Sequence, residues 1–490
     1  MNFAEAINNE SKKTYTENGA LALNTTGNAL LDLFGTIGAL RNADTNRIHS
    51  LFAEAYKESP LLATKCLFYA RDIRGGLGER ETFRKLINYA AKYHQEALHK
   101  NIPLIPEYGR WDDLYSLVGT PLEENMWKYV KFQFNADLVS MAAGASVSLM
   151  AKWLKAPDVS SKQSCALGRL TARKLGYDEK SYKRALRKLR AYLNIVERDM
   201  SQNRWNEIEY STVPSRASML YRNAFFRHDE EGFRKFLDAV TKGETKINAA
   251  TLYPYDIIEK YTNGYWWDLD RFKQDDILEA QWKALPEYVT KGTNAIVIAD
   301  TSGSMCGRPM ASALGLAIYF AEHNKGAYHG LWMSFSDNST VQRIKGETLA
   351  QKLSNIDYSG WGCNTNLRQA FQHILDIAID NHVSPEEMVK SLIVISDMEI
   401  DQCTTGQWTF YDLMKKRYAE AGYEIPNVVF WNVDSRHDVF HADAKRKGVQ
   451  LCSGQSASTF KHLLESIGAT PMEMMLKVLN DKRYEKITVA

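Results

Sequence analysis

The sequence predicts an α + α/β fold, with a helical N-terminal part followed by an α/β domain built around a doubly wound, mostly parallel sheet. At 490 residues the chain is too long for one hydrophobic core, so we expect two domains. From about residue 44 to 290, apolar residues recur three and four positions apart, which is the period of amphipathic helices. Beyond Gly292, short apolar runs alternate with helical patterns, which favours a parallel sheet covered on both faces. The boundary near residue 290 gives domains 1–290 and 291–490.

The helical part is predicted to be an array of paired helices. The stretches "TNRIHSLFAEAYKES", "PLLATKCLFYARDI" and "ERETFRKLINYAAKYHQEAL" each carry apolar residues on one helical face. Short breaks at Pro60, Gly75-Gly76 and Pro103 separate them, and no strand pattern intervenes. Helix following helix in this way is typical of a solenoid or ring of HEAT-like repeats. The sequence shows no repeat of fixed period, so this prediction depends on the hydrophobic pattern alone.

The C-terminal part is predicted to contain four strands and four helices. The strand patterns are "NAIVIA", "GLWMSF", "SLIVIS" and "NVVFWNV", and the helices span about 309–324, 366–381, 407–421 and 456–467. In a parallel sheet of this kind, ligands bind beyond the carboxyl ends of the strands. Asp300 and Asp397 directly follow two of the predicted strands, so we expect a functional site at this edge.

Composition and cysteine usage exclude several classes of protein. An apolar fraction of 44% and a charged fraction of 24% are ordinary for a soluble globular protein, and the net charge of +2 points to no particular partner. The polar N-terminus lacks the features of a secretory signal, and the stretch "GNALLDLFGTIGAL" is too short to span a bilayer. Six scattered cysteines without a Cys-x-x-Cys pair indicate a reducing compartment. We expect a cytoplasmic, monomeric protein without membrane contact.

The stretch "IVIADTSGSM" leaves an apolar strand and offers one carboxylate and two hydroxyls at alternate positions. Asp300 stands where a serine-hydrolase elbow requires glycine. An aspartic protease needs a second such aspartate, and the sequence has no second copy of this context. An aspartyl-phosphate enzyme usually has an acid where Ser302 stands. A site for a hard divalent cation fits better, because Mg²⁺ prefers oxygen ligands and needs only one or two carboxylates.

Two further loops offer oxygen ligands at the same predicted edge. "GWGCNTNL" carries Thr365 at the start of a helix, and "LIVISDMEID" carries Asp397 at the end of a strand. Asp-x-Ser-x-Ser followed by these two residues resembles the metal-ion-dependent adhesion site of von Willebrand factor A domains. The resemblance implies that Asp300, Ser302, Ser304, Thr365 and Asp397 hold Mg²⁺ or another divalent cation. Where that family often has Gly-Gly-Thr, this chain has "GWGCNT".

The resemblance also implies an open coordination position, which a carboxylate of an acidic protein partner completes. Few of the ligands are charged, so the ion keeps net positive character and attracts an anion. Glu399, two residues beyond Asp397, is the nearest acid that could act on a metal-bound water. We interpret Glu399 as a solvated loop carboxylate, and we expect no enzymatic activity. A metal-dependent nuclease is a minor alternative, because the chain lacks the two-carboxylate, two-metal pattern expected of one.

Basic residues concentrate in one segment of the helical part. Between Lys162 and Arg204 there are twelve Lys or Arg against four acids. A charge run is most often a solvated helix face, but here few acids alternate with the bases. Such a local excess in a near-neutral chain favours a polyanionic partner. In "SYKRALRKLRAYLNIVERD", the residues Lys183, Arg187 and Arg190 are predicted to share one helical face.

Other basic residues lie beside glycines or aromatic residues. Arg71 and Arg74 precede Gly75-Gly76, where the N–H groups of a helix start could add to phosphate binding. Tryptophans beside Arg110 and Lys152 could stack on unpaired bases, although each aromatic taken singly is more often part of a core. The candidate RNA-binding residues are Arg71, Arg74, Arg110, Lys152, Lys162, Arg173, Lys174, Lys183, Arg187, Arg190 and Arg216.

Several stretches, in the same order along the chain, resemble a known group of proteins. "RDIRGGLGERETF", "IPLIPEYGRWDDL", "KINAATLYPYDII" and "NAIVIADTSGSM" are similar to uncharacterised plant, bacterial and phage proteins related to the TROVE-module proteins, the Ro autoantigens. TROVE proteins join a ring of HEAT-like repeats to a von Willebrand A domain and bind non-coding RNA. The resemblance implies single-stranded RNA ends in the ring and duplex on its basic outside. The likeness to the true Ro proteins is weaker, so their particular RNAs do not transfer.

Two functions follow as hypotheses. The first is an RNA-binding scaffold, in which basic helical repeats bind non-coding or single-stranded RNA and the Mg²⁺ site engages a second protein or stabilises the ring. The second is a metal-dependent protein-interaction adaptor without nucleic acid. Chelation separates them, because removing the ion abolishes partner capture but leaves RNA affinity mostly intact.

Overall fold

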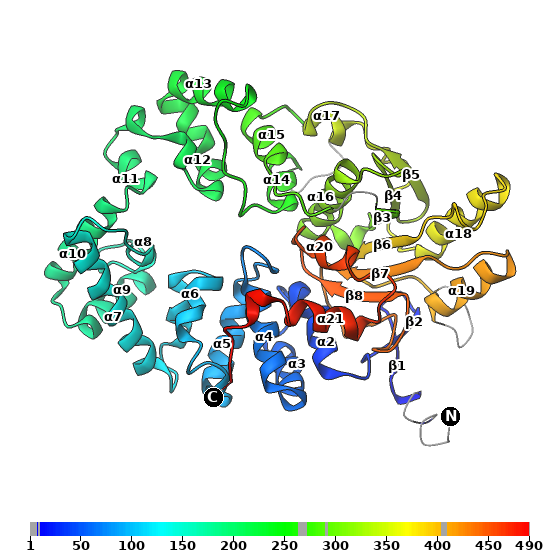
Figure 1. The fold of residues 1–490 in the computed structure, drawn as a ribbon, viewed down its shortest axis with the longest axis horizontal. Coiled ribbons are helices and arrows are strands. Elements are labelled where there is room, and N and C mark those ends of the chain that lie inside the picture. The colour runs from blue at the N-terminus through cyan, green and yellow to red at the C-terminus, as the bar shows by residue number, and fades with distance from the viewer. Residues whose placement is uncertain (1–6, 8–9, 263–271, 290–292, 403–408, 490) are drawn as a thin grey trace.

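The computed structural model describes residues 7, 10–262, 272–289, 293–402 and 409–489. Figure 1 shows a largely helical chain with one sheet of six strands in its C-terminal half. The predicted α + α/β fold class is therefore confirmed. None of the helices in the described ranges combines the length and the apolar character that a membrane-crossing helix needs.

The N-terminal half consists of helices whose ends are fixed by local capping. Side chains of Asp44, Ser59, Ser161 and Asp178 accept hydrogen bonds from the first turns of the helices that follow them. The helices are α2 (Ala29–Thr36), α3 (Thr45–Glu58), α4 (Pro60–Arg71), α5 (Glu81–Tyr93), α6 (Ile105–Tyr108), α7 (Glu123–Ala142), α8 (Met150–Trp153), α9 (Lys162–Leu175), α10 (Glu179–Tyr192), α11 (Val196–Ser201), α12 (Ser215–His228), α13 (Glu230–Thr241), α14 (Pro254–Thr262) and α15 (Asp276–Lys283).

The sheet has the strand order β5-β4-β3-β6-β7-β8, and β5 alone runs antiparallel to its neighbour. Strand β6 is buried at every position, which means that both faces of the sheet are covered there. The strands are β3 (Ala295–Asp300), β4 (Leu331–Phe335), β5 (Ser339–Arg343), β6 (Ser391–Ser396), β7 (Asn427–Asn432) and β8 (Val449–Ser453). The helices of this domain are α16 (Arg308–His323), α17 (Leu349–Ser354), α18 (Leu367–Asp380), α19 (Phe410–Glu420), α20 (Thr459–Leu464) and α21 (Pro471–Leu479).

The strand order reverses between β3 and β6. Strand β3 pairs with β4 on one side and with β6 on the other, parallel in both cases. Crossovers that leave in opposite directions from two neighbouring strands open a crevice at their carboxyl ends. Asp300 ends β3 and Asp397 follows β6, so both aspartates lie at this crevice.

Both ends of the helical part pack against the sheet domain. Helices α2 and α4 contact α21, and α2 also contacts β8. At the other end, α14 packs along α16. In Figure 1 the helices between these two attachments, from α5 through α13, follow an arc that leaves the sheet domain and returns to it.

The N-terminal segment belongs structurally to the C-terminal domain. Strands β1 (Lys13–Tyr15) and β2 (Leu21–Leu23) form a small antiparallel hairpin. Gly19 bridges to Asp401, and Leu23 exchanges backbone hydrogen bonds of 2.8 Å with Phe440. Gly38 then passes so close to Gly454 that a Cβ atom on it would lie 2.6 Å from the Gly454 Cα, so only glycine fits there. The boundary near residue 290 therefore separates two sequence patterns, while residues 13–38 pack with the second of them.

The four predicted strands correspond to β3, β4, β6 and β7, and all four are confirmed. Strands β5 and β8 were not predicted, because the short segments "STVQR" and "VQLCS" mix polar and apolar residues. The predicted helices at 309–324, 366–381 and 456–467 correspond to α16, α18 and a shorter α20. The predicted helix at 407–421 corresponds to α19, and its first two positions lie outside the described residues.

Hydrophobic side chains form one large core and one smaller cluster. The large core runs from α2 through α10 and continues into both sides of the sheet. The smaller cluster joins α12, α13 and α15 around Phe225, Phe233 and Ile277. Helices α12 and α13 of the arc therefore have a small core that is separate from the large one.

Candidate metal centre at the sheet edge

Asp300 is a fully buried carboxylate at the crevice. Its Oδ1 accepts a hydrogen bond of 2.9 Å from the Ser302 backbone N–H, and its Oδ2 accepts one of 2.6 Å from the Ser396 hydroxyl. Burial and the neighbouring charge of Asp397 raise the pKa of Asp300 to about 7, against the opposing effect of these hydrogen bonds. The raised pKa shows that two negative charges side by side are unfavourable at this buried position.

Ser302 and Ser304 present their hydroxyls side by side. Their Oγ atoms lie 3.1 Å apart, Ser302 fully buried and Ser304 exposed. A 3-10 turn over Gly303–Met305 follows Ser302 and places the two hydroxyls together. A Cβ on Gly303 would lie 3.9 Å from the Cα and Sγ of Cys363, so this turn lies against the loop that leads to Thr365.

Thr365 is buried and bound to the loop that follows β6. Its backbone N–H donates to Asp401 Oδ2 over 2.9 Å, and its carbonyl accepts from the Asp401 N–H over 3.1 Å. The side chain of Asn18 donates to its Oγ1 over 3.5 Å. The structure therefore brings Asp300, Ser302, Ser304, Thr365 and Asp397 to one edge of the sheet, as the sequence predicts.

Asp397 is bound by an arginine that the sequence did not single out. Arg436 donates to Asp397 Oδ2 over 2.7 Å, and its second terminal nitrogen lies 2.7 Å from Glu17 Oε2. The Glu399 N–H donates to Asp397 Oδ1 over 3.1 Å. Asp397 thus already has a cationic partner, and Arg436 links this buried aspartate to the N-terminal segment.

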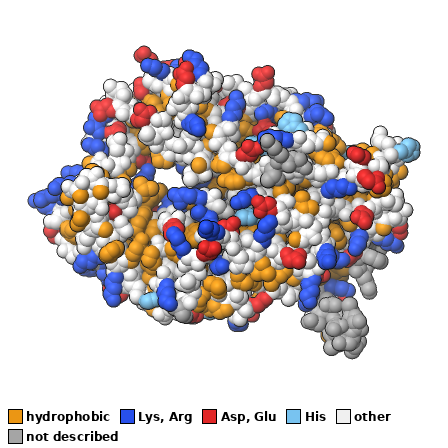
Figure 2. Space-filling model, in the orientation of Figure 1, with side chains coloured by type: hydrophobic (Ala, Val, Ile, Leu, Met, Phe, Trp, Pro, Cys, Tyr) orange, Lys and Arg blue, Asp and Glu red, His pale blue; other side chains and the backbone are white. Residues whose placement is uncertain are grey.

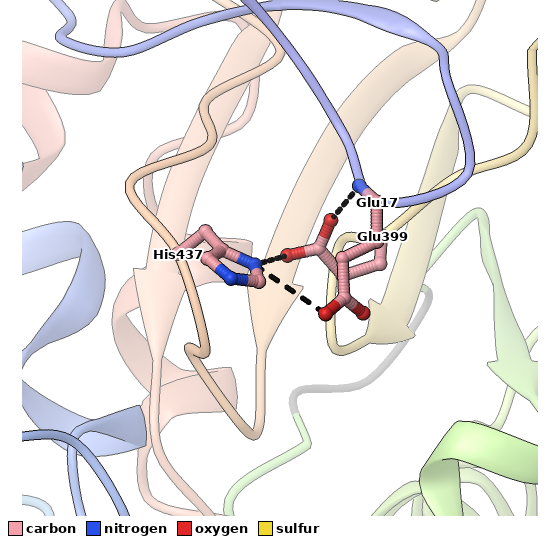
Figure 3. Close-up of side chains that lie close together, drawn as sticks. All are labelled: Glu17, Glu399 and His437. Carbon is pink, nitrogen blue, oxygen red and sulfur yellow. Dashed lines mark hydrogen bonds and ion pairs between the residues drawn. The ribbon is translucent and has the colours of Figure 1, made fainter.

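Glu399 is buried, so its interpretation as a solvated loop carboxylate is wrong. Its Oε2 accepts a hydrogen bond of 2.7 Å from the Glu17 N–H, and its Oε1 lies 3.0 Å from His437 Nδ1. Figure 3 shows the three side chains converging from separate segments. Glu17 and His437 were not predicted from the sequence. Glu17 lies 382 positions and His437 38 positions from Glu399, and no local motif marks either of them.

The turn between Asp397 and Glu399 is strained and held in place by a histidine. Met398 has a φ of 69°, in the left-handed region that side chains other than glycine seldom adopt. His441 lies 3.1 Å from the Met398 carbonyl through its Nε2 and is fully enclosed. This hydrogen bond requires the proton on Nε2. Burial lowers the pKa of His441 to about 4 and so favours the neutral ring.

The five residues fit a hard divalent cation by their chemistry. They offer carboxylate and hydroxyl oxygens only, two of the hydroxyls are already adjacent, and two carboxylates are enclosed with one arginine beside them. Mg²⁺ prefers six oxygen ligands and commonly keeps several waters, so two aspartates and three hydroxyls meet its requirements.

The structure divides the predicted RNA-binding residues into structural and exposed groups. Arg71 is buried, and its Nε donates over 2.8 Å to the buried Asp113. Arg190 donates to the carbonyls of Ala151 and Leu154 over 2.9 and 2.8 Å, which closes the end of α8. Arg71 and Arg190 therefore make contacts within the fold, which do not favour the predicted phosphate contacts.

Five more of the predicted residues are paired with carboxylates. Arg110 also lies over an aromatic ring, with its guanidinium carbon 4.2 Å from the centroid of Trp153. The pairs are Arg110 with Asp112, Lys152 with Glu197, Lys174 with Glu123 and Glu124, Lys183 with Asp158, and Arg216 with Asp256. Such pairs offset much of the charge that a phosphate would meet.

The other four, Arg74, Lys162, Arg173 and Arg187, are exposed. Helices α9 and α10 carry three of them and add Lys180, Arg184 and Lys188, which are exposed too. Within the described ranges no carboxylate lies at ion-pair distance from these six side chains. We call Lys162, Arg173, Lys180, Arg184, Arg187 and Lys188 the α9–α10 basic surface. Figure 2 shows Lys and Arg side chains along the outer edge of the arc in this region.

The fold and site define a class of two-part proteins, in which a helical arc is attached at both ends to a parallel-sheet domain with an oxygen-lined crevice. Residues 16–138 and 147–293 match the model of a domain of unknown function (DUF2828), and residues 294–488 match that of another (DUF7788). The first match covers more than half of the chain, so the chain belongs to the DUF2828 family.

One relative aligns with both parts of the chain. It is the uncharacterized protein L728 of Acanthamoeba polyphaga mimivirus, which is 29% identical over 507 residues. The alignment covers 95% of this chain and 87% of the viral protein. These similarities describe families without an assigned activity, so the function has to be argued from the surface and the site.

Proposed function

We propose that this protein is an RNA-binding scaffold whose helical arc binds single-stranded or non-coding RNA through the α9–α10 basic surface. The observation that carries the proposal is the set of six exposed cations with no carboxylate of the described ranges at ion-pair distance. Uncompensated positive charge favours a polyanion, because each phosphate contact releases condensed counterions from the nucleic acid.

The geometry of α10 supports this proposal. Lys180, Arg184, Arg187 and Lys188 recur four, seven and eight positions apart, so they share one face of the helix. The opposite face is buried through Tyr182, Leu186 and Leu189. Helix α9 packs against α10 and extends the basic surface with Lys162 and Arg173. A rigid, exposed row of cations suits the backbone of a flexible nucleic acid strand.

The resemblance to TROVE-module proteins also supports RNA binding by the helical arc. In those proteins a ring of HEAT-like repeats is joined to a von Willebrand A domain, and the ring binds RNA. Here the helical arc begins and ends on the sheet domain, and the strand order and oxygen ligands suit such a domain. We therefore include HEAT-like repeats, a von Willebrand A-like domain and a cytoplasmic ribonucleoprotein in the proposal.

In this proposal the sheet edge binds Mg²⁺ through Asp300, Ser302, Ser304, Thr365 and Asp397. The ion would supply a positive centre for an acidic side chain of a protein partner. The chain's own residues orient that centre: Ser396 and the Ser302 N–H hold the Asp300 carboxylate, and Arg436 holds Asp397. No catalytic step is part of the proposal.

A protein-interaction adaptor without RNA is the second candidate, and the exposure of Ser304 beside four buried ligand residues favours it. Cross-linking in cells followed by sequencing of the co-purified nucleic acid tests the main proposal. We expect enrichment of specific RNAs, with cross-links on α9 and α10. A purified protein that carries no RNA, but captures an acidic protein only when Mg²⁺ is present, would favour the adaptor.

A further inference from the structure

We propose that Glu17, Glu399 and His437 form a second metal site, separate from the Mg²⁺ ligands, that binds a divalent transition ion of the Zn²⁺ class. Their ligand atoms all lie within 4.8 Å of one another. The inference concerns other residues and another ion than the proposed function, so either can fail alone.

The three side chains already have the arrangement of a metal triad. His437 Nδ1 lies 3.0 Å from Glu399 Oε1 and 3.9 Å from Glu17 Oε1. Ligand atoms bonded to Zn²⁺ at about 2.0–2.1 Å in tetrahedral geometry lie about 3.3 Å apart. The observed distances lie on both sides of that value, so small side-chain rotations bring all three atoms onto one ion. Figure 3 shows the three groups facing a common point.

One of the three ligands is fixed before an ion arrives. Glu399 is buried, and its other oxygen accepts a hydrogen bond of 2.7 Å from the Glu17 N–H. Its backbone carbonyl accepts a further hydrogen bond of 2.7 Å from Asn18. Such supporting hydrogen bonds orient a ligand and strengthen metal binding. Glu17 and His437 are 43% and 53% exposed, which leaves an approach from solvent and room for a water as fourth ligand.

The electrostatic surroundings favour a dication at this point. Glu17, Glu399 and Asp397 are three neighbouring carboxylates, and in the described part of the chain Arg436 is the one Lys or Arg that pairs with them. Three carboxylates against one guanidinium leave this point negative, which favours a divalent cation. The ion would replace the present contact between His437 Nδ1 and Glu399 Oε1, since a metal ligand must be deprotonated.

The ligand types select the kind of ion. An imidazole nitrogen with two carboxylate oxygens suits Zn²⁺, whereas Mg²⁺ prefers oxygen ligands alone. The ion would join three segments: the turn between β1 and β2, the loop after β6, and the loop after β7. By binding all three segments, the ion would hold the hairpin of β1 and β2 against the sheet edge beside Asp300.

Titration of the metal-free full-length protein with Co²⁺ tests the proposal, since Co²⁺ in a tetrahedral nitrogen and oxygen site gives visible absorption bands. We expect one such site, displaced by equimolar Zn²⁺ but not by millimolar Mg²⁺. His437→Ala and Glu17→Ala should each weaken Co²⁺ binding at least tenfold, and Asp300→Ala should leave it unchanged. His99→Ala and Glu420→Ala, which also change exposed side chains, are the matched controls.

Hydrogen exchange provides a second measurement. Zn²⁺ should slow exchange of the amides of residues 13–23 in the wild-type protein and have no effect on them in His437→Ala. Circular dichroism checks that both proteins are folded. Tight, unchanged Co²⁺ binding by His437→Ala and Glu17→Ala would overturn the proposal, as would loss of the bands in Asp300→Ala alone.

Discussion

Arg436 joins Asp397 to Glu17: one of its terminal nitrogens lies 2.7 Å from Asp397 Oδ2 and the other 2.7 Å from Glu17 Oε2. A single guanidinium therefore neutralises a buried aspartate of the sheet edge and holds the N-terminal segment against it. This pair of contacts explains why residues at the very start of the chain belong to a site formed by its C-terminal half.

Replacing Arg436 by alanine should destabilise the protein and strengthen Mg²⁺ binding. Asp397 would lose its cationic partner, which we expect to cost about 2 kcal/mol once the partial exposure of Arg436 is allowed for. The freed carboxylate is then available to an ion. Chemical denaturation and calorimetric Mg²⁺ titration measure the two effects. Arg446→Ala, which breaks the pair with Asp412, is the control and should leave Mg²⁺ affinity unchanged.

Replacing Asp300 by alanine should abolish stabilisation by Mg²⁺. An ion present at a hundred times its dissociation constant stabilises the folded state by about 2.7 kcal/mol. We expect a denaturation midpoint that rises with Mg²⁺ in the wild-type protein and stays constant in the variant. Asp412→Ala on α19 should respond as the wild type does. Equal Mg²⁺ responses in Asp300→Ala and wild type would contradict the assignment of this edge.

Reversing the charges of Arg184, Arg187 and Lys188 to glutamate should weaken RNA binding at least tenfold and flatten its salt dependence. The wild-type slope of log affinity against log salt should approach about −4, from about −0.7 for each of six phosphate contacts. Fluorescence anisotropy with a single-stranded RNA measures both. Lys92, Lys235 and Lys447 are exposed lysines elsewhere, and their reversal to glutamate is the matched control. A triple variant that binds like this control would refute the role of α10.

Replacing Arg71 by methionine should destabilise the fold without changing RNA affinity. The buried Asp113 would keep its hydrogen bonds of 2.7 Å from Arg84 and 2.9 Å from the Arg110 N–H but lose the Arg71 partner. We expect a loss of about 3 kcal/mol in the free energy of unfolding. Arg187→Met changes a side chain on the exposed face of α10. We expect it to leave the free energy of unfolding unchanged and to weaken RNA binding. Reduced RNA affinity in a folded Arg71→Met protein would contradict this prediction and would indicate that Arg71 contributes to RNA binding.

His441 should make the protein less stable in acid. Its pKa is lowered to about 4 by burial, from 6.5 in the unfolded chain, so between these values the unfolded state binds a proton that the folded state does not. Stability is full above pH 6.5 and falls by about 3 kcal/mol as the pH drops to 4. His441→Gln keeps a donor near the Met398 carbonyl but cannot titrate. Denaturation series at several pH values should show a smaller loss in this variant than in the wild type.

The strands and helices of the sheet domain could be predicted because their signals are local. The runs "NAIVIA" and "SLIVIS" are apolar throughout, as strands buried on both faces must be, and they became β3 and β6. The polar residues directly after them could also be placed, since parallel strands end at one edge. Thr365 was found by its position at the start of α18. Strand β5 was missed because an edge strand needs no apolar run.

The partners of charged side chains could not be predicted in this way. Glu399 looked like a loop carboxylate, and only packing against a segment 382 positions earlier encloses it. Arg71 and Arg190 looked like Lys183 and Arg187 in the sequence, yet the first is enclosed with Asp113 and the second closes the end of α8. In the sequence, a buried and an exposed arginine have the same charge and the same helical spacing, so these two features do not distinguish them.

The sequence by itself determined the two kinds of architecture, the strands that carry the crevice, and the five oxygen-bearing residues at their ends. These follow from hydrophobic periods and turn residues within about ten positions of one another, where backbone geometry dictates which side chains share a face. The tertiary structure alone decided which basic side chains are exposed and which are buried or paired, and it alone brought Glu17, Arg436 and His437 to the sheet edge. Those outcomes depend on contacts between distant segments, where burial and the pairing of charges override local pattern.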